Sequence, residues 1–295
     1  MDAADLRVFE AVARLGGMNR AAGELNTVQS NVTARIRLLE EEVGTPLFRR
    51  HSRGVALTAA GRRLLPYAVR AGQLLADARR AVEDDGRPKG PLAIGSLETT
   101  AALRLPAILT AYAQAYPEVD LALSTGTTGE LVEWVLGHRL EGAFVCGPIE
   151  HPELEEEPVF SEELVIATAR AVRGLDELVR KGGLKVVVLR AGCSYRQRLE
   201  EILARRGIIG LRRLEFGTIE GILGCVAAGL GVTLLPKSVV GPAWADGRVA
   251  VHELPVTDAR VETVFIRRRD AFVSSALAAF LQCARPPLDR ANAAD

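Results

Sequence analysis

The sequence has few cysteines and no long apolar run. Its cysteines, Cys146, Cys193, Cys225 and Cys283, lie far apart, without the CxxC or CxxH spacing of zinc sites or a disulfide framework. We therefore expect reduced thiols and neither a metal nor a cofactor. No apolar run approaches the roughly 18 residues of a membrane span, and the acidic start MDAADLRVFEAVARL is unlike a secretory signal. These absences predict a cytoplasmic protein without a membrane partner.

The sequence also lacks the motifs of common enzyme classes. His51, His138, His151 and His252 have no GxSxG, HExxH or paired acid spacing nearby. The segment Gly229-Leu230-Gly231 resembles part of a dinucleotide loop, but the third glycine is missing and Leu-Pro follows. We predict no catalytic residue and no enzymatic activity.

The charge is unevenly placed, although the formal net charge is zero. The chain has only 4 lysines against 33 arginines, so arginine use as such carries little functional weight. Its clustering is more informative, because the segment 35–63 holds seven arginines against three glutamates. A local basic face of this kind favours binding to a phosphate backbone.

The N-terminal segment has the apolar spacing of three short helices. The first ends at the pair Gly16-Gly17, the second begins with Asn19 as its cap, and the third runs from about Gln29 to Glu42. Only the turn 26–28 separates the second and third helices. A turn this short is typical of a helix-turn-helix, in which the second helix of the pair projects from the body.

The third helix has one apolar and one polar face. Val32, Ile36 and Leu39 recur at core-facing spacing, and the polar side chains opposite them are of the types that pair with base edges and phosphates. On this pattern alone, a plain helical bundle with a solvated face is the alternative. The predicted DNA contacts of this helix are Gln29, Ser30, Thr33, Arg35 and Arg37.

The segment 44–58 has the pattern of a wing, with a short apolar strand, a basic turn containing glycine, and a second strand. Basic side chains at the tip would reach flanking phosphates or a narrow minor groove. This pattern favours DNA binding over the plain bundle. The predicted wing contacts are Arg49, Arg50 and Arg53.

A long helix follows, from Thr58 as its cap to about Asp85. Its apolar residues recur at alternating steps of four and three, the seam of a two-helix coiled coil, which predicts a dimer. A helix packed on its own domain is the alternative, and Pro66 predicts a kink. The charged Gly/Pro segment 84–91 predicts a hinge. The seam residues are Leu64, Ala68, Ala71, Leu75, Ala78 and Val82.

Beyond residue 91, apolar β-branched runs alternate with amphipathic helices, as in an α/β domain with parallel strands covered on both faces. We assign 1–58 to the DNA-binding domain, 59–90 to the linker helix and hinge, and 91–295 to the α/β domain. The tail from Arg285 is expected to fray. The predicted strands are LAIGS, VDLALST, EGAFV, LVIAT, KVVVLRA, VTLLP and TVFIRR.

Two motifs resemble those of LysR-type transcription regulators: LxxFxxVARLGGMNRAAGELNTVQSNVTARIRLLEEEVGTPLFRR with the following LTAAG, and VAAGLGVTLLP at 226–236. The resemblance covers nearly the whole chain. It implies a winged helix-turn-helix, a dimerising linker helix and a two-lobed sensor domain similar to a periplasmic binding protein, usually assembled as a homotetramer. The implied lobes are 91–162 with 265–295, and 163–264. The implied partners are double-stranded DNA, a small effector, further copies of the chain, and RNA polymerase.

Two segments depart from the family pattern. Many relatives have Ser-Gln-Ser at the start of the recognition helix, whereas this chain has Val28-Gln29-Ser30. A capping hydroxyl therefore comes from Thr27 or is absent. Where many relatives have Leu-Asp-Leu-Ala-Ile, the segment 140–145 reads LEGAFV, which predicts an altered cleft wall.

The resemblance places an effector cleft where strands end and helices begin, and free amides and helix dipoles there favour an anion. Four such helix starts carry hydroxyls or a thiol, which predicts a small polar pocket for a carboxylate-type metabolite. Helix capping alone is the alternative role for these side chains. The candidates are Ser96, Thr99, Thr100, Thr125, Thr127, Thr128, Cys193, Ser194, Tyr195 and Thr218.

Two other hypotheses remain open on the sequence. A helix N-terminus beside Arg196 and Arg198 would make Cys193 a reactive thiolate, and peroxide-sensing relatives use a cysteine in this region, so the chain could be a redox-responsive regulator. A neutral thiol lining the cleft explains the same residue. Alternatively, the chain binds a metabolite and its DNA-binding domain is non-functional. The polar face of the third helix is evidence against this alternative.

Overall fold

The computed structural model describes residues 1–51, 54–175, 177, 184–189 and 194–285. The chain divides into two compact units, residues 1–85 and 86–295. Within the described ranges, no helix is both long enough and apolar enough to cross a membrane.

The first unit is a helical domain with a two-stranded wing. Asp2 and Asp5 form a capping box at the start of its first helix, and Gly16, at φ 66°, ends that helix as expected. The second helix begins at Met18 with Gly17 as its cap, so the assignment of Asn19 as the cap was wrong. The elements are α1 (Ala3–Leu15), α2 (Met18–Glu24), α3 (Gln29–Val43), β1 (Phe48–His51), β2 (Gly54–Leu57) and α4 (Ala59–Glu83).

A single core joins these helices to the wing. The Phe9 ring of α1 lies 5.2 Å from the Phe48 ring of β1, and both side chains are buried. The wing also pairs with the end of α1, because the Val55 amide donates to the Gly16 carbonyl oxygen over 3.2 Å. A Cβ at Gly54 would lie 2.5 Å from that same oxygen. Glycine at position 54 therefore allows the wing to lie directly against α1.

The helix α4 is capped as the sequence predicts. The Thr58 hydroxyl oxygen accepts a hydrogen bond from the Gly61 amide over 3.1 Å, and Pro66 lies within the helix. A Cβ at Gly61 would lie 2.2 Å from the Leu47 carbonyl oxygen, so a side chain has no room there.

The second unit is an α/β domain. A seven-stranded sheet has the order β10-β6-β11-β5-β3-β4, with β9 also paired to β6, and β7 and β8 form a separate pair. The strands of the whole unit are β3 (Gly90–Ser96), β4 (Val119–Thr125), β5 (Gly142–Cys146), β6 (Leu154–Ala169), β7 (Lys185–Leu189), β8 (Arg212–Phe216), β9 (Thr233–Pro236), β10 (Val249–His252) and β11 (Arg260–Arg268). Its helices include α5 (Glu98–Leu103), α6 (Leu105–Ala115), α7 (Thr128–Leu136), α9 (Ser194–Arg205), α10 (Ile219–Ala227), α11 (Lys237–Ala245), α12 (Val256–Ala259) and α13 (Ser275–Ala284).

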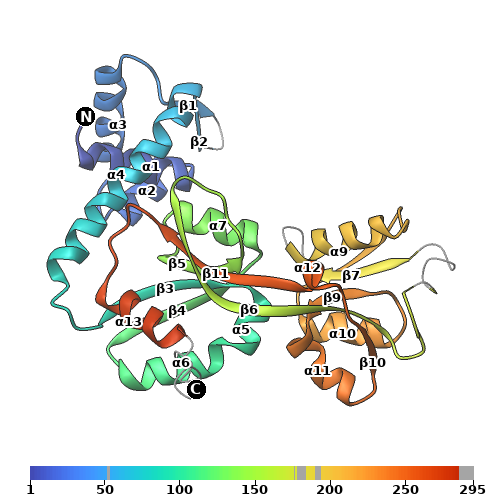
Figure 1. The fold of residues 1–295 in the computed structure, drawn as a ribbon. Helices are drawn as coiled ribbons and strands as arrows, with labels where there is room; N and C mark the ends of the chain where they lie inside the picture. The colour runs from blue at the N-terminus through green and yellow to red at the C-terminus, as the bar shows by residue number, and fades with distance from the viewer. Residues whose placement is uncertain (52–53, 176, 178–183, 190–193, 286–295) are drawn as a thin grey trace. The chain divides into compact units, whose positions relative to one another are not determined.

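The all-parallel expectation is correct for only part of this sheet. The strand β3 runs parallel to β4 and β5, and β7 runs parallel to β8, but β6, β9, β10 and β11 pair antiparallel. The 16-residue strand β6 and its partner β11 extend from one lobe into the other (Figure 1). The predicted lobe boundaries at 162/163 and 264/265 therefore fall inside these two strands.

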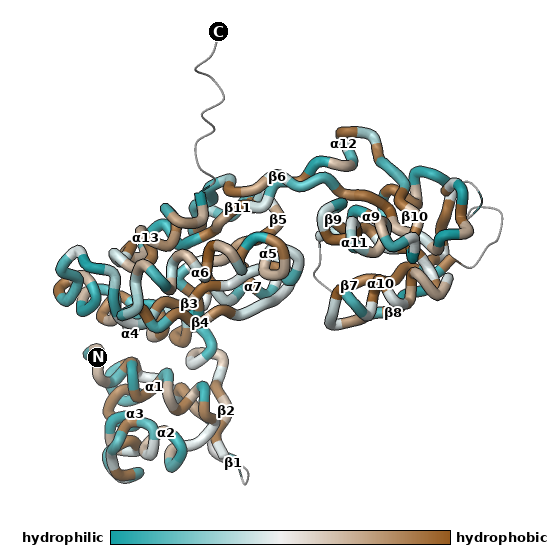
Figure 2. The backbone as a smooth tube through the Cα atoms, turned by 90° about the horizontal axis from the view of Figure 1, so that it is seen from below, coloured by the Kyte–Doolittle hydropathy of each residue, from teal (hydrophilic) through white to brown (hydrophobic). Residues whose placement is uncertain are grey.

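Each lobe is covered by helices on both faces. In the first lobe, α6 and α13 pack on one face around Tyr112 and Phe280, and α7 packs on the other through Leu131. In the second lobe, α10 and α11 share a core with Val187 of β7, while α9 lies on the opposite face. Figure 2 shows hydrophobic stretches along β3 and α10, in keeping with this burial.

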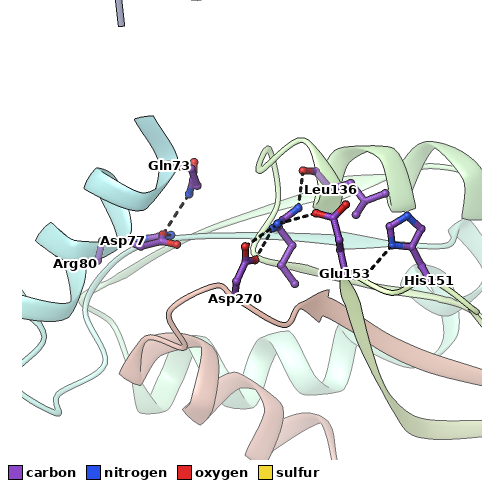
Figure 3. A network of polar contacts seen from close by, with 8 residues as sticks. Gln73, Asp77, Arg80, Leu136, His151, Glu153 and Asp270 are labelled. Carbon is purple, nitrogen blue, oxygen red and sulfur yellow. Dashed lines mark hydrogen bonds and ion pairs between the residues drawn. The ribbon is translucent and has the colours of Figure 1, made fainter. Parts of the chain in front are cut away.

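A buried arginine stands at the end of β11. Arg268 is 4% exposed, and its guanidinium bonds both carboxylate oxygens of Asp270 at 2.8 Å. Glu153 lies 3.0 Å from the guanidinium and the Leu136 carbonyl oxygen lies 3.3 Å from it. Figure 3 shows Leu136, Glu153 and Asp270 gathered in this polar network. The hydrogen bond to Asp270 is the main cause that raises the pKa of Arg268, and the same contact lowers the pKa of Asp270. The buried cation is thus neutralised within its own unit.

Candidate DNA-binding surface and effector cavity

The recognition helix α3 begins without a side-chain cap. Its N-cap is Val28, in extended conformation with φ −93° and ψ 150°. The Thr27 hydroxyl oxygen instead accepts a hydrogen bond from the Asn31 side-chain amide over 3.0 Å. The preceding Asn26 has a positive φ of 50°, which gives the short turn its shape. Of the two possibilities left by the sequence, the absent cap is the one observed.

The predicted contact residues of α3 do not all present their polar groups to solvent. Gln29 and Ser30 are exposed, and Arg37 has a side chain 79% exposed that bonds Glu41 over 2.9 Å. The Thr33 hydroxyl oxygen, by contrast, is buried and has no hydrogen-bond partner among the described residues. The expectation that Thr33 turns its hydroxyl outward is therefore not met.

The remaining basic candidates differ in what they bind. Arg35 pairs with Asp5 over 2.8 Å, so its guanidinium ties α3 to the start of α1. Arg49 is exposed on β1. Arg50 lies on the same strand, but its side chain is outside the described part of the structure, as is Arg53 altogether.

The second unit contains a cavity of about 360 Å³ to which both lobes contribute. The side chains at the start of α7 and α9 meet there, because the Ser194 hydroxyl donates to the Thr128 hydroxyl oxygen over 3.1 Å. The cavity is lined by Leu97, Glu98, Thr99, Thr125, Gly126, Thr127, Thr128, Glu130, Trp134, Cys146, Leu189, Ser194, Tyr195, Phe216 and Gly217.

Most of the predicted effector-binding residues are brought together here. The predicted residues that line the cavity are Thr99, Thr125, Thr127, Thr128, Ser194 and Tyr195. Three others do not line it: the buried Ser96 donates to the Leu97 carbonyl oxygen over 3.0 Å, Thr100 is buried, and Thr218 caps α10 by accepting from the Gly221 amide. Cys193 lies outside the described residues.

A carboxylate that was not among the predicted residues lies at the start of α7. Glu130 accepts hydrogen bonds from the Thr127 amide and from the Thr127 hydroxyl, both over 2.9 Å, in a capping box. The helix start predicted to bind the effector's anion therefore already has an anion of the chain itself. The Thr-x-x-Glu spacing at 127–130 is the signal that could have revealed it.

The cavity also has an apolar wall that was not predicted. Its large members are Leu97, Leu189, Trp134 and Phe216. The Arg139 guanidinium lies 4.8 Å from the centroid of the Trp134 ring, a cation–π contact that helps to hold the ring in place. Nothing in the sequence pattern distinguished these residues from ordinary core side chains.

The family models match both units. Residues 85–288 match the LysR substrate binding domain, and residues 3–62 match the bacterial regulatory helix-turn-helix protein model of the lysR family. The chain belongs to the LysR family of transcriptional regulators. The members of this family are not enzymes, and this LysR-type regulator has a DNA-binding domain and an effector-binding domain. The resemblance noted in the sequence is thus confirmed.

Individual relatives cover almost the whole regulator. It is 46% identical over 286 residues to the uncharacterized HTH-type transcriptional regulator YusT of Bacillus subtilis, covering 97% of this chain and 96% of the relative. It is 44% identical over 276 residues to the regulator GltR of the same organism, covering 94% and 93%. The structure of full-length CbnR with its target DNA has a TM-score of 0.62 and 26% identity, covering 96% of this chain and 99% of that one.

Proposed function

We propose that this LysR-type regulator binds its promoter through α3 and the wing, and that a small metabolite in the cavity modulates that binding or the bending of the DNA. The observation that carries the proposal is the cavity itself, because both lobes line it and Ser194 bonds Thr128 across it. A ligand in this position touches both lobes. Such a ligand binds one relative placement of the lobes better than another, which is the condition for shifting an equilibrium between two states.

The lining favours a ligand with one anionic end and an apolar body. The hydroxyls of Thr99, Thr125 and Thr128 offer hydrogen bonds to a carboxylate, and the aromatic wall covers a hydrocarbon portion. The chain's own carboxylates at Glu98 and Glu130 also line the cavity and repel every negative charge on a ligand, so hydrogen bonds from the hydroxyls can offset this cost for one carboxylate but not for two. The proposed effector is therefore a monocarboxylate rather than a dicarboxylate.

The coupling to DNA requires more than one copy of the chain. The predicted seam of α4 divides in two. Ala68 is buried in the core of its own unit and Leu64 packs against that core, as in the alternative of a helix packed on its own domain. Leu75 and Val82 are 49% and 87% exposed, which supports the proposal that a second copy covers this later part of the seam. The resemblance adds the proposal of a tetramer. In such an assembly, closure of the lobes changes the spacing of the paired DNA-binding domains, and with it DNA bending and contact with RNA polymerase.

A ligand screen on the full chain tests the cavity. Its melting temperature is measured with matched apolar monocarboxylates, dicarboxylates and amides, and the monocarboxylates are expected to raise it most. Trp134→Ala and Thr128→Val should abolish the increase, because they remove part of the apolar wall and a hydroxyl. The control Thr110→Val changes an exposed threonine on α6 and should leave the increase intact. Equal increases in all variants would contradict the proposed site.

A further inference from the structure

The start of the recognition helix carries an apolar side chain where a polar one is usual. Val28 is the N-cap of α3 and makes no side-chain cap hydrogen bond. Serine, threonine, asparagine and aspartate stabilise this position because a side-chain oxygen accepts from a free backbone amide, and valine is among the poorest residues there. Local helix stability therefore does not explain valine at position 28.

Core packing does not explain it either. The Val28 side chain belongs to a residue that is 65% exposed, whereas Val32, one turn later, is fully buried. The Val28 carbonyl oxygen accepts from the amides of Asn31 and Val32 over 3.1 and 3.4 Å, so the backbone of Val28 is committed to the helix. Val28 is thus largely exposed, and it is followed by two other exposed residues, Gln29 and Ser30.

We infer that Val28 is a specificity-determining residue that contacts the C5 methyl group of a thymine in each half-site of the operator. This inference rests on the proposed function, in which α3 binds the promoter, because recognition helices of this kind contact base edges in the major groove through their N-terminal residues. The thymine methyl is the apolar group that unmodified DNA presents on base edges in that groove. An exposed valine at the groove-facing end of the helix matches it in chemistry, whereas the serine of many relatives would not.

The expected effect follows from the burial of one methyl group. Loss of that contact should weaken binding about fourfold in one half-site. If the two half-sites act independently, loss in both should weaken binding about fifteenfold. Shortening the valine side chain removes the same contact. The affinity lost by removing the thymine methyl and the affinity lost by shortening Val28 should therefore not add.

The test replaces single thymines by deoxyuridine, which removes only the methyl group. The full-length protein first selects a specific site from a random duplex library at fixed salt. Each thymine of that site is then replaced in turn, and the dissociation constant is measured by fluorescence anisotropy for the parent chain and Val28→Ala. Val43→Ala is the matched control, because Val43 is a 37% exposed valine at the opposite end of the same helix.

For the parent chain and Val43→Ala, replacing one particular thymine in each half-site by deoxyuridine is expected to lower the affinity for DNA about fourfold. For Val28→Ala, the same replacement is expected to leave the affinity unchanged. Val28→Ser should bind specific DNA without this methyl dependence and should melt at a higher temperature, because it restores a cap. The inference is overturned if no thymine is methyl-dependent, or if Val28→Ala keeps the dependence. If the parent chain selects no specific site at all, the proposed function fails and the inference fails with it.

Discussion

Replacing Thr33 by valine should stabilise the DNA-binding unit and leave its affinity for DNA unchanged. The Thr33 hydroxyl oxygen is buried and has no hydrogen-bond partner among the described residues. Valine has nearly the same shape, and its helix propensity is close to that of threonine. The change therefore removes an unpaired polar group and adds no volume.

The magnitude follows from the cost of a buried, unpaired polar group, which is about 1–3 kcal/mol. The free energy of unfolding should rise by about 1 kcal/mol or more, and each kcal/mol raises the melting temperature of a unit of this size by about 4–8 °C. The unit comprises residues 1–85. An increase of several degrees is readily measured by scanning calorimetry.

The control is Thr45→Val in the same unit, where the threonine is exposed and the expected change lies within about 0.5 kcal/mol. DNA affinity is measured on the same preparations by anisotropy. An unchanged affinity with a higher melting temperature would agree with the buried hydroxyl. A tenfold loss of affinity without stabilisation would show that the hydroxyl faces the groove, as the sequence pattern suggested.

Four further predictions concern other sites. Gly61→Ala should destabilise the first unit by about 1–3 kcal/mol, because its Cβ would lie 2.2 Å from a carbonyl oxygen. Gly72→Ala should stabilise the unit by about 0.5–1 kcal/mol, because outside its own stretch of helix no atom of the described residues lies within 4 Å of the added Cβ, and urea titration compares the two variants. Burial lowers the pKa of His252 below its usual 6.5, so the unfolded chain takes up a proton at a higher pH than the folded chain does. The free energy of unfolding should therefore decrease as the pH falls below about 6.5, and melting curves of His252→Gln should show less of this decrease. Arg37→Ala should weaken specific DNA binding by about 1–3 kcal/mol at constant salt, and equal binding would show that the assigned groove-facing side of α3 is wrong. Cys193→Ser should respond normally to the effector in a reporter assay, and a lost response to peroxide would support redox sensing instead.

The sequence predicts the first unit well, because its signals are local. Helical spacing gives α3 almost to the residue, and the cap at Thr58 and the stop at Gly16 are as expected. The cap of α2 was misplaced, since Gly17 takes the capping conformation without a side chain. The burial of the Thr33 hydroxyl could not be predicted, because it depends on how neighbouring helices cover that face of α3.

The second unit was predicted less completely, because its long strands are non-local. The first part of β6 reads LEEEPVFSEE, whose charges and proline conceal a strand that pairs with β11 along its length. The strands β8 and β10 were missed as well. The helix starts were a sound guide to the cavity, since Thr99, Thr128 and Ser194 do line it. Its aromatic wall was not predictable, because Trp134 and Phe216 come together only when the lobes fold.

The central claim is that a ligand in the cavity is coupled to DNA binding, and one titration tests it most directly. The dissociation constant of the parent chain for its selected operator is measured with and without the monocarboxylate that most raises the melting temperature of the protein. The dissociation constant of the parent chain for this monocarboxylate is then measured with and without operator. The account predicts that both affinities change by the same factor, because coupling between two sites is reciprocal, and that Trp134→Ala removes the change in both. Tight ligand binding that leaves operator affinity and DNA bending unchanged would contradict it.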